Sequence, residues 1–193
     1  AFEEAPEWLE DKAVIEEAFG RPAARAAPLP SPQLLSCIGV DGPENGDLPL
    51  LQHWLEHYAQ LGIPAAQMHV ILNSQDAGTP ALATARETLA RFGAAAPEIW
   101  IGPYTSQEMW DRRGTLQRTV ATAEDWIVNA DADEFHEYPA PLHEVVAVCV
   151  AREANFVQGP FVDRVADGGR LPPVLPDRPV WAQFPQAREV GLG

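Results

Sequence analysis

Three acidic side chains follow an apolar run in the second half of the chain. Residues 126–130 read WIVNA, which is typical of a buried strand, and Asp131, Asp133 and Glu134 come directly after it. Like charges repel and burial raises the cost of ionising a carboxyl group, so the cluster indicates a positive partner nearby. In an extended chain, residues i and i+2 point the same way, so Asp131 and Asp133 can converge on one point. Two oxygen ligands with open positions opposite suit Mg²⁺ or Mn²⁺, which completes its shell with phosphate oxygens and water.

Two other interpretations of this acidic stretch are open. A solvated acidic turn has the same Asp-x-Asp pattern, although the apolar strand before it favours a site here. A calcium-binding EF-hand matches at Asp131 and Asp133 but fails at the next positions. There Phe135 replaces the third ligand and His136 replaces the glycine of the sharp turn. A magnesium or manganese ion held by Asp131 and Asp133 is therefore the prediction for this segment.

A second motif with possible chemistry is HWLEH, residues 53–57, which fits the H-x-x-E-H pattern of inverted zinc peptidases. On a helix, His53 and His57 share a face one turn apart, with Glu56 adjacent as a possible base. The same helix needs an apolar stripe for its core contact, made of Leu50, Leu51, Trp54, Leu55, Tyr58 and Leu61. His53 and Glu56 project away from this stripe, toward solvent or a neighbouring segment. A polar helix face is the favoured interpretation, and zinc hydrolysis stays an alternative.

Segments with strand and helix character alternate from Leu34 onwards. The predicted strands cover residues 34–40, 68–73, 98–101 and 125–130, and the predicted helices cover 47–61, with Asp47 as its cap, 80–92 and 106–124. Strands separated by helices of this length indicate right-handed βαβ crossovers and a parallel sheet covered on both faces. Ligands bind such sheets at the carboxyl ends of the strands. Asp131 and Asp133 lie at one such end, and Asp76 follows another.

The flanks of this pattern differ in composition. Residues 3–19 predict an amphipathic helix that ends at Gly20, and residues 21–33, with four prolines, predict a linker. After the acidic cluster, the predictions are a helix over 139–152 and a strand over 155–165 with a Gly-Pro interruption. The tail from Gly168 is rich in proline and weakly patterned. We therefore expect an N-terminal helix and Pro/Ala-rich linker over 1–33 and one compact domain over 34–193.

Composition narrows the classes of partner. The 28 acidic and 13 basic residues give a net charge of −15, so nucleic acid is not an expected partner. A small anionic ligand would need a cation or a few local arginines. The sequence has no apolar run near the roughly 20 residues that cross a bilayer, so no transmembrane segment is expected and a cytoplasmic location is favoured. Cys37 and Cys149 each lie in an apolar stretch and are expected to be buried, reduced thiols.

Four stretches of the chain together resemble a known enzyme family. They are HWLEHYAQLGI (53–63), VILNSQDAGT (70–79), DWIVNADADEFHEYP (125–139) and FVQGPFVDRVADGG (156–169). The chain resembles the family 2-like glycosyltransferases of GT-A fold, particularly the branch close to glycosyltransferase family 92. The resemblance implies a GT-A-like α/β fold, with a Rossmann-like, mostly parallel sheet flanked by helices. It also implies metal-dependent, inverting transfer of a sugar from a nucleoside diphosphate, with UDP favoured, to a hydroxyl of a glycan or other acceptor.

The resemblance assigns roles to individual residues. Asp131 and Asp133 match the family's Asp-x-Asp motif, in which the second acid binds the metal and the first reaches the ribose or a metal-bound water. Asp76 matches an acidic position after the second strand that faces the nucleoside. Arg118 matches a basic position that approaches the diphosphate, and Arg113 is a weaker alternative.

The chain departs from the family pattern at two places. The first strand of the family often leads into Asn-Glu, whereas here the loop reads GVDGPENGD, with Glu44 and Asn45 reversed and displaced. The sequence ends at Gly193, where family members continue into the acceptor side, so we expect a C-terminal truncation and a base beyond it. Asp163 is the candidate base within the chain, although a salt bridge with Arg164 or a structural turn is its favoured role. A non-catalytic carbohydrate- or nucleotide-binding domain on the same fold is therefore the main alternative to an enzyme.

Overall fold

The computed structural model describes residues 32–42 and 46–189. The expected helix over 3–19, the linker up to residue 31 and the reversed pair Glu44 and Asn45 lie outside the described residues. The described chain divides into two compact units, one of residues 32–136 and 158–189, which we call the sheet unit, and one of residues 137–157. The sequence predicts a single domain over 34–193, whereas residues 137–157 form a unit of their own in the structure.

The sheet unit is built on four parallel strands. They are β1 (Gln33–Gly39), β2 (Met68–Ser74), β3 (Glu98–Ile101) and β4 (Ile127–Asn129). Their order across the sheet is β3-β2-β1-β4, and each adjacent pair is parallel. The five central residues of β1 are buried, which is why this strand reads as a continuous apolar run and not as an alternating one. The prediction of an α/β fold with a parallel sheet is confirmed, and the finer GT-A-like assignment stays a prediction.

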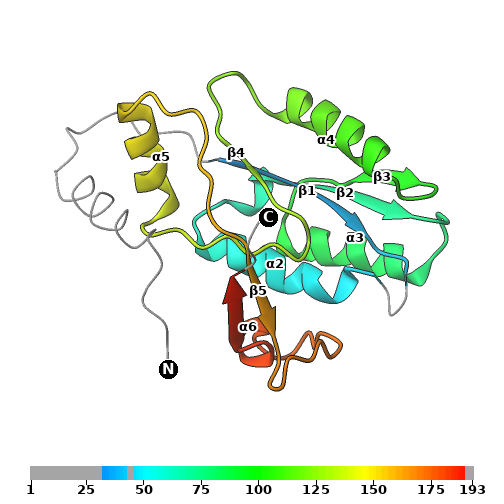
Figure 1. Ribbon diagram of the computed structural model, residues 1–193. Coiled ribbons are helices and arrows are strands. Elements are labelled where there is room, and N and C mark those ends of the chain that lie inside the picture. Colours follow the sequence, from blue (N-terminus) through cyan, green and yellow to red (C-terminus); the bar gives the residue numbers. More distant parts are fainter. Residues whose placement is uncertain (1–31, 43–45, 190–193) are drawn as a thin grey trace. The chain divides into compact units, whose positions relative to one another are not determined.

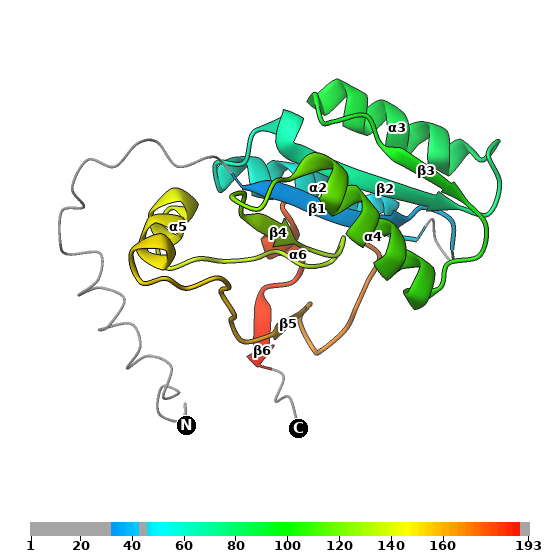
Figure 2. The same ribbon diagram turned by 90° about the horizontal axis from the view of Figure 1, so that it is seen from above.

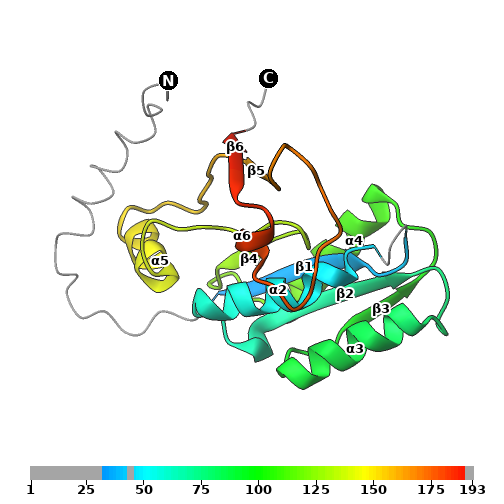
Figure 3. The same cartoon turned by 90° about the horizontal axis from the view of Figure 1, so that it is seen from below.

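Helices cover both faces of this sheet. Figure 1 shows α4 (Ser106–Val120) on one side of the strands and α2 (Leu48–Gln60) and α3 (Pro80–Phe92) on the other. Figure 2 and Figure 3 show the same layers from above and from below. On the α4 side, the core cluster consists of Cys37, Ile71, Trp100 and Met109, with Leu116 packed against it. The α2 side buries Leu51, Trp54, Leu55 and Tyr58. Full burial of one such leucine contributes roughly 1.5–3 kcal/mol.

Local capping signals set the ends of α3 at the residues that the sequence predicts. Thr79 Oγ1 accepts a hydrogen bond from Leu82 N at 3.2 Å, and Pro80 occupies the first turn. Gly93 ends the helix with a φ of 83°, a left-handed conformation that glycine adopts without strain. Sequence and structure agree here because both ends are encoded locally.

The helix α4 ends at Val120, earlier than the predicted end at residue 124. Asp125 Oδ2 accepts hydrogen bonds from Thr122 N at 2.8 Å and from Thr122 Oγ1 at 2.9 Å. Such side-chain bonds to the backbone compete with helical hydrogen bonds, so the chain turns before it enters β4.

The C-terminal part of the sheet unit contains a hairpin that the sequence does not predict. Strand β5 (Val162–Val165) pairs antiparallel with β6 (Gln186–Glu189), and α6 (Val180–Gln183) precedes β6. The predicted strand over 155–165 is shorter in the structure, because Pro160 has no N–H for a ladder. The weakly patterned tail from Gly168 onwards, in which the sequence predicts no element, contains α6 and β6. The β6 sequence QARE lacks the apolar alternation that would reveal a strand.

Residues 137–157 contain α5 (Leu142–Ala151), which buries Leu142, Val145, Val146 and Cys149. The helix begins at Leu142 and not at residue 139, because Pro141 holds the chain in an extended conformation at the N-cap. Among the described residues of both units, no helix is long and apolar enough to cross a membrane.

Candidate functional site

The carboxyl ends of β1 and β4 meet where the strand order reverses. The chain leaves β1 through α2 toward β2 on one side, while β4 adds to the other side of β1. A crevice at such a switch point is the usual ligand site of an open parallel sheet. Asp131 and Asp133 follow β4, and Asp47 lies at the end of the loop after β1.

The structure adds Asp47 to the acidic residues that the sequence singles out. Asp47 is the N-cap residue of α2, as predicted, but its side chain makes no capping hydrogen bond. Burial raises the pKa of Asp47 above its ordinary value, and the charges of Asp133 and Asp131 raise it further. Asp47, Asp131 and Asp133 therefore share one electrostatic environment, and we call them the three-carboxylate group. No sequence spacing reveals this grouping, because it depends on how β1 and β4 pair.

Arg113 on α4 is a positive partner of this group. Its Nη2 pairs with Asp131 Oδ1, and its side chain is 6% exposed while that of Asp131 is 47% exposed. Its guanidinium carbon lies 5.3 Å from the ring centre of Trp110, one helical turn earlier. One of the three negative charges is thus balanced by a buried cation.

The other predicted basic residue, Arg118, lies further along α4. Five residues correspond to about 7.5 Å along a helix axis. Because α4 runs from the carboxyl edge of the sheet back to the amino edge, this step leads away from Asp131. Arg118 is exposed, and its Nη2 donates to Thr115 Oγ1 at 3.1 Å. The structure brings Arg113 to the three-carboxylate group and does not bring Arg118 there.

Glu134 closes the loop after β4 on itself. We call this loop, residues 130–136, the acidic loop. Its Oε2 accepts a hydrogen bond from Asp131 N at 3.0 Å, and its own N donates to Asp131 O at 3.0 Å. These two bonds make a tight turn after β4. Glu134 therefore shapes the loop, and Asp133 is exposed within it.

The polar face of α2 holds the end of the same loop. Tyr58 Oη donates to Glu134 O at 3.0 Å and accepts from His136 N at 3.3 Å. His57 Nε2 donates to His136 O at 2.8 Å. The ring of Phe135 meets the ring of His57 edge-on, with centres 5.3 Å apart. The HWLEHY stretch is therefore a support for the acidic loop.

Both histidines of the HWLEH motif use their Nε2 atoms for contacts to backbone carbonyls. His53 is buried, and its Nε2 donates to Leu175 O at 3.0 Å, in the same way as His57 Nε2 donates to a carbonyl. A carbonyl oxygen only accepts, so both Nε2 atoms carry hydrogen, and only the Nδ1 atoms of these rings could bind a metal. Glu56 is exposed and accepts from Gln52 Nε2 at 2.6 Å. The sequence predicts that His53 faces solvent or a neighbouring segment. In the structure it faces the C-terminal segment around Leu175.

A cation at the Asp-x-Asp motif would take few protein ligands. In the part of the chain that the structure describes, no group of three or more His, Cys, Asp or Glu side chains is placed to hold one ion. Mg²⁺ commonly binds through one or two carboxylates and fills its shell with water and phosphate oxygens. The hard oxygen donors of Asp131 and Asp133 fit that arrangement and do not suit a closed structural zinc site.

Polar contacts join the end of β2 to the loop after β1. Ser74 is fully buried, and its Oγ donates to the carboxylate of Asp41, which also accepts from Gln75 N at 2.7 Å. Burial opposes ionisation of Asp41, but these hydrogen bonds, with one from Thr79, outweigh it and lower the pKa of the carboxyl group. Asp41 is not among the residues that the sequence predicts for the site, although its position directly after a strand was the available signal.

Asp76 lies in the turn between β2 and α3 and is exposed. Its Oδ1 accepts a hydrogen bond from Gly78 N at 2.7 Å, which is an Asx turn. One oxygen of the predicted nucleoside-facing carboxylate is therefore bound to its own loop.

Tyr104, after β3, is a further residue near the site that the sequence analysis missed. Burial raises its pKa, and the nearby Cys37 and Asp131 add to this effect. Its ring is 45% exposed and stacks on Trp100, with centres 5.4 Å apart. Cys37 itself is buried, and burial raises its pKa to about 12, so it does not serve as a nucleophile.

Asp163 lies exposed on β5, and the C-terminal hairpin contacts the acidic loop through other residues. The guanidinium of Arg164 lies 4.4 Å from the ring centre of Trp181, whose ring contacts Phe135 at 5.5 Å between centres. Neighbouring residues of a strand point to opposite faces. Arg164 therefore faces the aromatic side chains beside the acidic loop, and Asp163 faces away from them.

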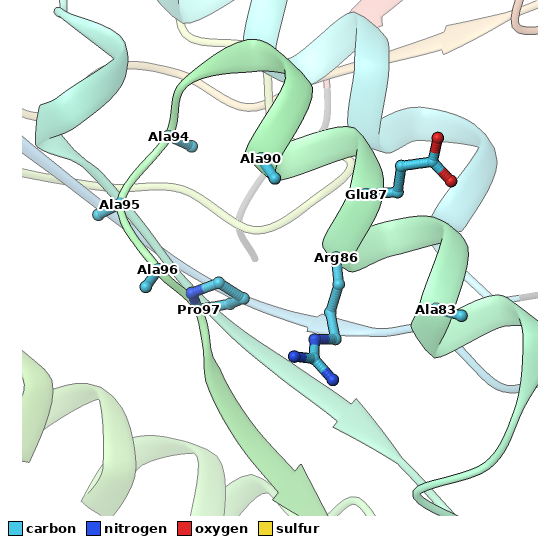
Figure 4. Close-up of a pocket in the computed structure, with 8 residues that line it drawn as sticks. All are labelled: Ala83, Arg86, Glu87, Ala90, Ala94, Ala95, Ala96 and Pro97. Atoms are coloured by element: carbon cyan, nitrogen blue, oxygen red, sulfur yellow. The ribbon is translucent and has the colours of Figure 1, made fainter.

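An open hollow of the sheet unit lies elsewhere. It has a volume of about 560 Å³ and is lined by Ala83, Arg86, Glu87, Ala90, Ala94, Ala95, Ala96 and Pro97. Figure 4 shows that α3 and the segment before β3 form its walls. This is the amino edge of the sheet, opposite to the three-carboxylate group, so the hollow has no part in that chemistry.

No protein-family model matches the chain, and a search of curated proteins finds no significant match. The functional assignment therefore depends on the residues of the site and on the fold that positions them.

Proposed function

We propose that this chain is a metal-dependent glycosyltransferase of GT-A-like fold. It transfers a sugar from a nucleoside diphosphate, with UDP as the favoured carrier, to an acceptor hydroxyl with inversion. The observation that carries the proposal is the three-carboxylate group at the switch point of a parallel sheet, in which Arg113 pairs with one carboxylate. The remaining negative charge favours a bound cation, and a cation favours an anionic diphosphate.

The chain's own residues have distinct tasks in this proposal. Asp133 is the main ligand of Mn²⁺ or Mg²⁺, because its carboxylate is exposed in the loop, and Asp131 offers its second oxygen. When bound, the ion supplies positive charge that offsets the charge growing on the leaving diphosphate. Tyr58 and His57 keep the loop in place before substrate arrives, which lowers the cost of orienting it. Asp76 remains the candidate contact to the nucleoside through its second oxygen.

Transfer to a hydroxyl also needs a group that accepts the acceptor proton. Asp163 is the candidate base within the chain. Its exposed position on β5 favours a second candidate function, a carbohydrate- or nucleotide-binding domain without turnover. The two functions differ in whether sugar nucleotide is consumed.

A thermal-shift panel of nucleotide sugars with and without Mn²⁺ tests the proposal. A ligand at 100 times its Kd stabilises the fold by about 2.7 kcal/mol, or roughly 5–10 °C in Tm for a chain of this size. We expect a uridine nucleotide to stabilise the wild type in Mn²⁺ and to lose this effect in Asp133→Asn. Asp111→Asn is the matched control, because Asp111 is an exposed carboxylate on α4 that accepts from Gln107.

A second readout separates an enzyme from a binding domain. Release of nucleoside diphosphate with Mn²⁺ and a hydroxyl acceptor is expected for a transferase, and Asp163→Asn tests the base. Binding without release would leave the binding domain as the function. A wild type that no nucleotide stabilises in Mn²⁺, or an Asp133→Asn variant that responds equally, would rule out the metal-dependent transferase.

A further inference from the structure

Arg113 is unusually placed for an arginine, and its placement carries a further inference. Its side chain is 6% exposed, although a guanidinium is among the groups that are least often buried. Two contacts account for its burial: the ion pair with Asp131 and the ring of Trp110 over its guanidinium. Its Nε is buried and has no hydrogen-bond partner among the described residues.

Arg113 cannot easily leave this position. A buried cation that loses its partner keeps the cost of desolvation without the compensating attraction, so the broken pair is strongly unfavourable. The Nε atom of Arg113 has no hydrogen-bond partner among the described residues, so it does not compensate for the burial of the charge. The ion pair with Asp131 is therefore the main interaction that stabilises the buried guanidinium. A cation that arrives at Asp131 therefore meets a carboxylate that is already held on one side.

The two oxygens of Asp131 are in different situations. Oδ1 accepts from Arg113, whereas Oδ2 has no hydrogen-bond partner within residues 32–42 and 46–189. With 47% of the side chain exposed, Oδ2 is the oxygen available to a ligand. A guanidinium on one oxygen fixes the plane of the carboxylate, as partners of metal-binding carboxylates commonly do.

We infer that Arg113 is a positioning residue that holds Asp131 by one oxygen so that the other oxygen binds the metal. The inference rests on the proposed function, because it assumes a cation at Asp131 and Asp133. It differs from a role for Arg113 as a diphosphate contact, since the guanidinium stays on Asp131 when the cation binds. Trp110 contributes by covering the guanidinium, which explains why a tryptophan that is 60% exposed lies at this point of α4.

Titration of Mn²⁺ without nucleotide, followed by the electron spin resonance signal of the free ion, tests the inference. We expect Arg113→Gln to weaken Mn²⁺ binding by about 10- to 100-fold. Arg113→Lys keeps the charge but loses the planar fork, so we expect an intermediate loss. Arg112→Gln is the matched control, because Arg112 lies on the same helix as Arg113 but pairs with Glu98 on β3 and Glu108 on α4. We expect its Mn²⁺ affinity to equal that of the wild type.

The outcomes are distinct. Equal Mn²⁺ affinity of wild type and Arg113→Gln would show a merely structural role, and higher affinity in the variant would show that Arg113 competes with the metal. Either result overturns the inference and leaves the proposed function intact. If the wild type binds Mn²⁺ neither alone nor with uridine diphosphate added, the inference and the proposed function fail together.

A measurement on the wild type covers the case in which the Arg113 variants do not fold. The Nε–H signal of a buried arginine exchanges slowly with water and can be followed by nuclear magnetic resonance during a titration with diamagnetic Mg²⁺. We expect the Arg113 signal to remain slowly exchanging at saturation, because the ion pair persists. Faster exchange on Mg²⁺ binding would mean that Arg113 is displaced, and would contradict the inference.

Discussion

The hydroxyl of Tyr58 donates to the backbone carbonyl of Glu134 at 3.0 Å and accepts from the backbone N–H of His136 at 3.3 Å. A single side chain on α2 thus ties down the loop that carries the acidic residues. Both backbone groups would otherwise need water or another partner at a partly buried position. The order of the candidate site therefore depends on a helix that contributes no proposed ligand.

Replacement of Tyr58 by phenylalanine tests this dependence. The loss of two hydrogen bonds with retention of the ring is expected to lower the free energy of unfolding by about 1–3 kcal/mol. For a chain of this size, this corresponds to a fall in Tm of roughly 2–4 °C per kcal/mol, measurable by calorimetry. Tyr104→Phe is the control, because the ring of Tyr104 is 45% exposed. Equal Tm values for wild type and Tyr58→Phe would show that the loop does not need this contact.

Two aspartates are expected to respond in opposite directions to replacement by asparagine. Burial and the charges of Asp133 and Asp131 raise the pKa of Asp47 against a backbone hydrogen bond from Gly39, so the charge of Asp47 destabilises the folded state relative to the unfolded one. Asp47→Asn should therefore raise Tm without metal, and no capping bond is lost because the carboxylate makes none. The lost charge should also weaken Mn²⁺ binding.

Asp41→Asn is the opposite case. Hydrogen bonds from Ser74 and Gln75 lower the pKa of Asp41 against the effect of burial, so its ionised form stabilises the fold. We expect this variant to lower Tm at neutral pH. The same direction of change in both variants would contradict the grouping of Asp47 with the other acids.

Stability is expected to fall when the pH is lowered from 7 toward 5. Burial lowers the pKa of His69, and it lowers that of His136 with a smaller contribution from His57, while Glu134 opposes it. The unfolded chain then takes up protons at about pH 6.5 before the folded chain does, so stability is present above this pH and is lost below it. Each histidine contributes at most about 1.4 kcal/mol per pH unit in this window.

Urea unfolding at several pH values measures this slope. His69→Gln should reduce it, because the half-buried ring next to Gln33 Oε1 is removed. His143→Gln, at a side chain that is 77% exposed, is the control. An unchanged slope in His69→Gln would assign the pH dependence to other groups.

The HWLEH stretch is expected to act in packing and not in zinc binding. His53→Gln should lower Tm by roughly 2–4 °C for each kcal/mol lost, because Leu175 O loses one of its two donors and keeps the one from Gln183 Nε2. Zinc added to wild type should cause no stabilisation that depends on His53 or His57. A stoichiometric zinc site that disappears in both His53→Gln and His57→Gln would revive the hydrolase alternative.

The sequence by itself determined the elements whose signals are local. The bounds of α3 follow from Thr79, Pro80 and Gly93, and the buried strands β1 and β2 follow from short apolar runs. The acidic residues after β4 were recognisable for the same reason, since their position depends on one strand and the turn after it. The short polar strand β6 was not predicted from the sequence. Its pairing with β5, and not its own residue pattern, makes it a strand.

The tertiary structure decided which side chains meet. Asp47 and Asp131 are far apart in the sequence and interact because β1 pairs with β4, a choice that no local pattern encodes. The selection of Arg113 over Arg118 depends on the direction and rotation of α4 against the sheet. The use of His57 as a donor to His136 depends on the path of the loop over α2. Long-range pairing sets these contacts, because the free energy that fixes them comes from burial between elements and not from neighbours along the chain.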